Sequence, residues 1–221
     1  MWFCRKRTLE QRGVFAGFTD WHCHILPGVD DGVQTLDESL QILAEYERLG
    51  VKEVWLTPHI MEDFPNTTQE LKERFADFKS AYRGPIELNL ASENMLDRQF
   101  EARLDADDLL PIGNEGSHLL VETSYFNPPM GLYSLLERIK SKGYHPVLAH
   151  PERYLYMSME DYRKLKSMNV FFQLNLFSLL GHYGAAVQKT AKKLEKLGFY
   201  DFTGTDLHRL QTLQSALYKK I

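Results

Sequence analysis

Seven short segments rich in β-branched and aromatic residues recur along this 221-residue chain. Their spacing, roughly thirty positions, limits the possible folds more than any other feature, because each segment reads as a β-strand. The segments are 18–24, 51–57, 86–92, 118–124, 145–150, 170–176 and 199–205.

The stretches between these predicted strands have helical spacing and helix start signals. Capping-box patterns at 35–38 and 67–70 predict the starts of two helices. Apolar spacing predicts further helices at 132–143, after Ser158 and at 187–198. A strand and helix alternation of this kind indicates a parallel sheet with helices outside it. The periodicity alone leaves an open doubly wound sheet and a closed barrel as alternatives.

The composition and the absence of a linker narrow the class of protein. No Pro/Ser-rich or low-complexity stretch interrupts the alternation, which predicts one domain at 18–221 after an N-terminal arm at 1–17. The arm has no apolar segment of the secretory type and is expected to be mobile or loosely docked. No apolar run is long enough to span a bilayer, so the protein is expected not to be membrane-embedded.

Charge and cysteine content point to a cytoplasmic protein that does not bind nucleic acid. Two cysteines, Cys4 and Cys23, are too few for a disulfide scaffold and fit a reducing cytoplasm. A net charge of −4 and a pI near 6.1 offer no general attraction for nucleic acid.

Histidines and carboxylates gather where the predicted strands end. In parallel β/α folds the carboxyl ends of the strands form the functional face. Imidazoles and carboxylates without a thiolate cluster suit Zn, Mn or Fe(II) in a catalytic site. The pattern therefore predicts a multinuclear metal site. Its candidate residues are His22, His24, Asp30, Asp31, His59, Glu93, Glu122, His150, Asp206 and His208.

Other histidines and Cys23 have different expected roles. His118 and His145 lie at the amino-terminal ends of their strands, and they are predicted to lie on the opposite face and to bind nothing. Cys23 alternates with His22 and His24 and is expected to point away from them into the core. His182 either donates a proton or touches substrate, or is a solvated loop histidine.

An ordered set of motifs resembles those of the polymerase and histidinol phosphatase (PHP) superfamily. Within that superfamily the chain is most similar to bacterial manganese-dependent protein tyrosine phosphatases linked to capsule and exopolysaccharide synthesis. The resemblance runs from about residue 18 to 208 and implies a distorted (β/α)7 TIM-like barrel. The motifs are DWHCHILPGVDDG (20–32), TPH (57–59), Glu93 of ASEN, VETS (121–124), LAHPER (148–153) and GTDLH (204–208).

The resemblance implies three divalent metal ions, with manganese expected and iron or zinc as alternatives. The first would take His22, His24, Glu93 and Asp206; the second Glu93, Glu122 and His150; the third Asp31, His59 and His208. Asp31 is preferred to Asp30 because the acid of the family directly precedes a glycine, here Gly32.

The resemblance also assigns substrate and catalytic roles. Arg153 matches the arginine expected to grip phosphate, and it is expected to act in catalysis with Asp31 and His59. The second arginine of the family is not found at its usual offset, and Arg209 is the candidate replacement. Apart from the resemblance, aromatic residues around the site, Phe64 and those of the loops at 123–130 and 153–157, either flank a tyrosyl ring or anchor the loops; those expected to bind substrate are Tyr125 and Phe126.

The expected reaction is hydrolysis of phosphotyrosine in a protein by a metal-bridging hydroxide. The cysteine-dependent route is excluded, because Cys4 and Cys23 lack an arginine six positions later. The expected partner is a tyrosine-phosphorylated protein, in particular a bacterial tyrosine kinase of polysaccharide assembly. The alternatives are a phosphatase of a small phosphomonoester such as histidinol phosphate, a phosphodiesterase or nuclease, and a metal-stabilised interaction module without turnover.

Overall fold

The computed structural model of this protein describes residues 7–219. Within them, every predicted strand segment contains a strand, and two of the segments, 51–57 and 86–92, are each followed by a short strand that was not predicted. The strands are β1 (Thr19–Cys23), β2 (Glu53–Leu56), β3 (His59–Ile60), β4 (Glu87–Leu90), β5 (Glu93–Met95), β6 (His118–Glu122), β7 (His145–Ala149), β8 (Phe171–Asn175) and β9 (Phe202–Gly204).

All paired strands are parallel, and they form a curled sheet in two parts. The first part has the order β1-β2-β4 and the second the order β3-β5-β6-β7-β8-β9. The strand β2 ends before Pro58, which has no N–H to donate to a ladder. It continues as β3, just as β4 continues as β5, so two stretches of chain run through both parts of the sheet.

The first and last strands lie side by side. The N–H of His24 donates to the carbonyl of Leu207 at 2.9 Å, and the N–H of Asp206 donates to the carbonyl of His22 at 2.7 Å. The buried carboxylate of Asp20 accepts from the backbone N–H and the hydroxyl of Thr205 at 2.8 and 2.6 Å. These bonds join the first strand to the last one and to the residues that follow it, and they hold the sheet in its curl. The molecule is a single-domain α/β fold with a curled parallel sheet.

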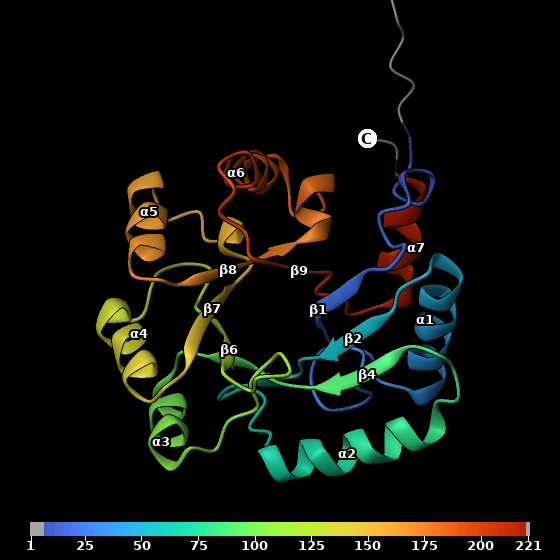
Figure 1. The fold of residues 1–221 in the computed structure, drawn as a ribbon, viewed down its shortest axis with the longest axis horizontal. Helices are drawn as coiled ribbons and strands as arrows, with labels where there is room; N and C mark the ends of the chain where they lie inside the picture. Colours follow the sequence, from blue (N-terminus) through green and yellow to red (C-terminus); the bar gives the residue numbers. More distant parts are fainter. Residues whose placement is uncertain (1–6, 220–221) are drawn as a thin grey trace, which may run out of the picture.

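Helices cover the outside of the sheet (Figure 1). They are α1 (Leu36–Leu49), α2 (Thr68–Ala81), α3 (Arg98–Ala106), α4 (Leu132–Ser141), α5 (Met159–Ser167), α6 (Ala185–Lys196) and α7 (Leu210–Tyr218), with 3-10 turns η1 (Glu10–Arg12), η2 (Pro151–Arg153) and η3 (Leu176–Leu180). The sequence pattern did not single out α3 or α7. In the part of the chain that is described, no helix has the length and apolar character needed to cross a bilayer.

One of the two predicted capping boxes is wrong in part. At α2, Thr67 and Glu70 make the complete reciprocal pair. At α1, Thr35 accepts from the N–H of Glu38 at 3.3 Å, but the carboxylate of Glu38 accepts from the N–H of Leu210 at 3.0 Å. Glu38 therefore supplies an acceptor to the start of α7, because the curl of the sheet places α1 and α7 together.

The described part of the N-terminal arm is docked. Leu9 and Phe15 are buried in the core, and the ring of Phe15 contacts those of Phe18 and Tyr46 at centroid separations of 5.6 and 6.1 Å. The expectation of a mobile or loosely docked arm is therefore wrong for residues 7–17, because their apolar side chains are buried. Residues 1–6, with Cys4, lie outside the described residues.

Candidate metal centre

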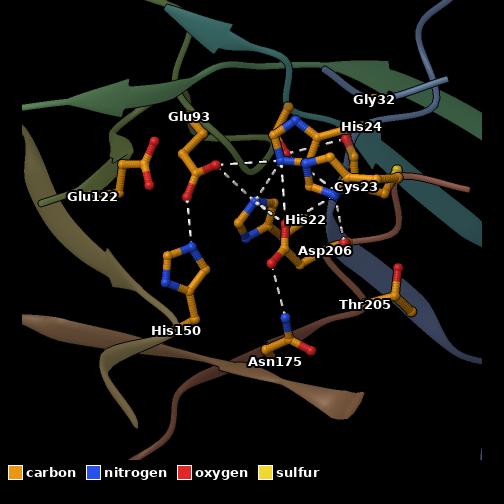
Figure 2. A network of polar contacts seen from close by, with 12 residues as sticks. His22, Cys23, His24, Gly32, Glu93, Glu122, His150, Asn175, Thr205 and Asp206 are labelled. Carbon is orange, nitrogen blue, oxygen red and sulfur yellow. Dashed lines mark hydrogen bonds and ion pairs between the residues drawn. The ribbon is translucent and has the colours of Figure 1, made fainter. Parts of the chain in front are cut away.

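Four polar side chains converge at the carboxyl end of β1 (Figure 2). His22 and His24 are two residues apart on a strand, so their rings project to the same side, and their Nε2 atoms lie 3.0 Å apart. The Oε2 atom of Glu93 lies 3.1 and 3.3 Å from these two nitrogens, and the Oδ1 atom of Asp206 lies 3.6 and 3.4 Å from them. All four residues are buried.

Glu93 is the centre of a wider cluster. Its Oε1 lies 3.0 Å from Nε2 of His150, and its Oε2 lies 3.2 Å from Nδ1 of His59. Nδ1 of His59 also lies 2.9 Å from Oε1 of Glu122. Yet neither of these two buried atoms has a hydrogen-bond partner of suitable geometry among the described residues. Polar atoms that face each other without bonding are typical of metal ligands without their ion.

A third group lies nearer the surface. Oδ1 of Asp31 lies 3.6 Å from Nε2 of His59 and 3.5 Å from Nε2 of His208. The ring of His24 lies between those of His59 and His208, at centroid separations of 4.3 and 4.1 Å. The side chain of Asp31 is 55% exposed, so this group opens toward solvent.

Backbone geometry brings these side chains in at the cost of local strain. His150 and Asp206 have φ angles of 32° and 52°, in a region of backbone conformation that residues other than glycine rarely adopt. A Cβ at Gly32 would lie 2.2 Å from the carbonyl oxygen of His24, so only glycine lets the loop at 25–33 fold back onto the site.

Charge compensation dominates the electrostatics of the cluster. Burial lowers the pKa of His22, but the carboxylates of Glu93 and Asp206 outweigh it and raise that pKa to about 9. A hydrogen bond with His208 lowers the pKa of Asp31 to about 2. Burial raises the pKa of Glu93, but the surrounding histidines outweigh it and hold that pKa well below its usual value. Positive charge on the histidines therefore keeps Asp31 and Glu93 ionised.

The donor set fits divalent metal ions. Ligand atoms held about 2.0–2.2 Å from a common ion are separated from one another by about 3.0–3.6 Å. The separations between His22, His24, Glu93 and Asp206 that are given above fall in that range. Metal ions would supply the positive charge that protons on the histidines otherwise provide.

Asp30 and Asp31, adjacent in sequence, have different environments. Oδ2 of Asp30 lies 2.8 Å from Nδ1 of His24 and accepts from the backbone N–H of His59 at 3.0 Å. Burial raises the pKa of Asp30, and the charge of His24 outweighs it and lowers that pKa. Asp30 thus orients His24 from behind, whereas Asp31 faces the cluster, which supports the preference for Asp31 as a ligand.

Replacing Asp30 by asparagine is expected to weaken metal binding by about 10- to 100-fold, because the amide loses the negative charge beside His24 and has a single oxygen for the contacts with His24, His59 and the N–H of Gly32. Titration of the metal-free protein with Mn²⁺ measures this affinity. Asp63→Asn, at an exposed position in a neighbouring loop, is the matched control. An Asp30→Asn protein that binds Mn²⁺ as tightly as the unaltered chain would show that Asp30 does not orient the site.

Arg153 lies beside the cluster in a cavity of about 390 Å³. Its Nη1 lies 2.7 Å from Oδ2 of Asp206. Its guanidinium is held between the rings of Tyr125 and Tyr183, each with its centroid 4.3 Å away. Arg153 is therefore not an exposed arginine in a surface ion pair, since its side chain is 18% exposed and lines a concave site. Other residues around the cavity are Asp31, His59, Met61, Phe64, Met95, Glu122, His182, Asp206, His208 and Thr212.

Two other predicted substrate contacts, Phe126 and Arg209, are not among the residues that line this cavity. Phe126 is 88% exposed and is absent from the cavity wall. Arg209 is also absent from the wall, and its Nη1 donates to the carbonyls of Gly32 and His208. In this structure Arg209 therefore joins the Gly32 loop to the segment after β9. Of the predicted aromatic candidates, Phe64 and Tyr125 line the cavity.

The other singled-out residues are placed as follows. His118 and His145 pair at the amino-terminal ends of β6 and β7 and pack on Phe171, away from the cluster. Cys23 is buried in the core, as predicted, with Sγ 3.5 Å from the carbonyl oxygen of Trp55. His182 lines the cavity.

Three supporting residues were missed from the sequence. Oε1 of Gln173 lies 2.9 Å from Nδ1 of His22, and Asn175 donates to Oδ2 of Asp206 at 2.9 Å. Gln173 and Asn175 alternate at the end of a strand, as His22 and His24 do, and that alternation was an available signal. Tyr183 had no such signal, because only the fold brings its loop onto Arg153.

The fold and the cluster define a class of protein: an α/β fold with a curled parallel sheet and a metal-type donor set at the carboxyl ends of its strands. A family model described as capsular polysaccharide synthesis, CpsB/CapC, matches residues 18–219, so the chain belongs to this family.

Named relatives agree with this assignment. Tyrosine-protein phosphatase YwqE of Bacillus subtilis is 26% identical over 214 residues, which cover 90% of this chain and 82% of that protein. Tyrosine-protein phosphatase CpsB of Streptococcus pneumoniae is 26% identical over 212 residues, covering 87% and 84%. A crystal structure from work on YwqE of Bacillus subtilis and CpsB of Streptococcus pneumoniae, described as unique metal-dependent tyrosine phosphatases, matches with a TM-score of 0.81 at 26% identity. The match covers 91% of this chain and 85% of that one.

Proposed function

We propose that this protein is a metal-dependent protein tyrosine phosphatase that acts in capsular or exopolysaccharide synthesis. The observation that carries the proposal is the convergence of buried imidazoles and carboxylates beside Arg153, which is held in an open cavity between two tyrosine rings. The names of the relatives and the membership of the CpsB/CapC family support it.

We further propose three metal positions and a distorted (β/α)7 barrel that carries them. The proposed ligands are His22, His24, Glu93 and Asp206 for the first ion, Glu93, Glu122 and His150 for the second, and Asp31, His59 and His208 for the third. The contacts of Glu93 on both of its oxygens support its role as the shared ligand. Manganese is the proposed ion, and iron and zinc suit the same donors.

In the proposed hydrolysis of a phosphate ester, the metal ligands and Arg153 have different roles. Bound divalent ions would activate water and neutralise phosphate oxygens. Arg153 would hold the remaining phosphate oxygens through its planar fork of N–H donors. The tyrosine rings on both of its faces and its contact with Asp206 keep the guanidinium in one orientation before substrate arrives.

The cavity walls favour an aromatic ester. Phe64, stacked on His59, and Tyr125 supply ring surfaces beside the cluster. A tyrosine phenolate, with a parent pKa near 10, leaves with less protonation than an alkoxide. Burial and the nearby cations Lys219 and Arg153 lower the pKa of His182, which makes it neutral rather than a ready proton donor at neutral pH.

The setting follows from the same proposal. A tyrosine-phosphorylated protein is the substrate, and we propose a bacterial tyrosine kinase of polysaccharide assembly as that protein, with the reaction in the cytoplasm. The net charge of −4 makes a nucleic-acid substrate the weaker alternative.

The test uses one peptide sequence that carries either phosphotyrosine or phosphoserine. Protein stripped with a chelator and reloaded with Mn²⁺, Fe²⁺ or Zn²⁺ is assayed for phosphate release, with a small alkyl phosphate and a single-stranded DNA as comparison substrates. We expect release from the phosphotyrosine peptide alone, lost on chelation and restored by reloading. Folded, metal-loaded protein that leaves phosphotyrosine intact would refute the proposal.

A further inference from the structure

Exposed apolar side chains gather on two loops beside the cavity. Met130 is fully exposed, Phe126 is 88% exposed and Leu155 is 60% exposed, and Tyr125 is the fourth large apolar residue exposed there. These residues lie between β6 and α4 or between β7 and α5, and the two helices are neighbours at one side of the fold (Figure 1). Exposed apolar patches of this kind mark contact surfaces rather than stability elements.

A groove of about 410 Å³ lies between the same two segments. The start of α4 and the residues before it form one wall, with Pro128, Pro129 and Tyr133, and Tyr156 and Met157 belong to the other. The hydroxyl of Tyr133 donates to Asp161 at 3.2 Å, which ties the two walls together. The prolines fix two φ angles in the first wall and so limit its movement.

The groove and the cavity share an aromatic wall. The ring of Tyr125, in the cavity, stacks on Tyr154 at 5.9 Å, and Tyr154 stacks on Tyr156, in the groove, at 5.8 Å. Tyr125 and Tyr156 are therefore less than about 12 Å apart, a span that an extended chain covers in about four residues. A peptide whose phosphotyrosine lies in the cavity can reach the groove with a nearby side chain.

The charge of the surface decides what kind of partner it fits. Residues 123–136 and 154–159 contain no Asp, Glu, Lys or Arg. Binding to an anionic membrane depends on clustered Lys and Arg, which these two segments lack. The groove is aromatic and proline-walled, and Asp161, the charged residue of its lining, accepts from Tyr133, so the groove suits an apolar side chain of a peptide instead.

We propose that this groove binds an apolar or aromatic side chain of the substrate, within about four residues of the phosphotyrosine. The inference rests on the proposed phosphatase function and adds a sequence preference to it. The cavity takes the phosphotyrosine, the groove takes the flanking side chain, and the exposed loop residues cover the chain between them.

The experiment compares phosphotyrosine peptides that differ at one position. A leucine is moved from four residues before to four residues after the phosphotyrosine in a Gly/Ser background, and kcat/KM is measured with Mn²⁺-loaded protein. At one or two positions we expect kcat/KM to rise about tenfold over the peptide without leucine, since an apolar side chain becomes buried. Equal values at every position would overturn the inference while leaving the phosphatase function intact.

Two variants locate the effect. Ser134 is exposed and lines the groove, so Ser134→Trp places an indole across it, while Ser134→Ala leaves it open. We expect the leucine preference to fall to about one in Ser134→Trp and to persist in Ser134→Ala. A preference that survives Ser134→Trp would place the flanking side chain elsewhere and overturn the assignment.

Other occupants give different results. If the protein sediments with vesicles of phosphatidylcholine and phosphatidylglycerol and shows no leucine preference, the groove binds a lipid surface and the peptide inference is overturned. If analytical ultracentrifugation shows a dimer that Ser134→Trp dissociates, again without a leucine preference, the groove binds a second copy of the chain and the peptide inference is overturned. Loss of hydrolysis on every phosphotyrosine peptide would instead refute the phosphatase function itself.

Discussion

Replacing Glu93 by glutamine is expected to lower kcat/KM for a phosphotyrosine peptide by roughly 10³-fold, with loss of bound metal. Both oxygens of this carboxylate face imidazole nitrogens at 3.0–3.3 Å, from His22, His24, His59 and His150. Glutamine keeps the shape but removes the charge and one acceptor. Two proposed metal positions therefore lose the ligand that they share.

Kinetics and elemental analysis of the purified variant measure the two effects together. Glu62→Gln, at an exposed position just after β3, is the matched control, and we expect it to keep both metal and activity. Far-UV circular dichroism checks that each protein is folded. A Glu93→Gln protein with full metal content and near-normal kcat/KM would exclude Glu93 as a shared ligand.

Replacing Arg153 by lysine is expected to lower kcat/KM by roughly 10²-fold while metal content stays the same. Lysine keeps the positive charge but loses the planar fork of donors and the stacking between Tyr125 and Tyr183. A group that grips phosphate in the transition state affects kcat, whereas one that only attracts substrate affects KM.

Steady-state kinetics on a phosphotyrosine peptide separate these two cases. Arg163→Lys, on the exposed face of α5, provides the same substitution outside the cavity, and we expect little change from it. Unaltered kinetics for Arg153→Lys would mean that the arginine serves Asp206 alone, through their 2.7 Å contact.

Much of the secondary structure followed from local patterns. The strands were found because each buried segment carries its own apolar and β-branched residues. The helix α7 was not singled out. At its start, the N–H of Leu210 donates to the carboxylate of Glu38, which lies 172 positions earlier in the chain. The docking of Leu9 and Phe15 was missed for a similar reason, because it depends on a surface that other parts of the chain create.

The candidate site could be located in outline before its geometry was known. The histidines and carboxylates end parallel strands, so their side chains were expected at one rim, and they lie there. The preference for Asp31 came from a motif, while the separate task of Asp30 came from its contacts with His24 and His59. The place of Arg209 on the carbonyl of Gly32, rather than in the cavity, depended on loop packing.

Short stretches of neighbouring residues were enough to predict most of the strands and helices and the chemical types of the candidate ligands, because local spacing and residue type carry both. They did not predict which atoms meet: the two oxygens of Glu93 among four histidines, the tyrosines on both faces of Arg153, and the groove beside them. Such contacts depend on the curl of the sheet and the packing of its loops, which are set by many distant residues together.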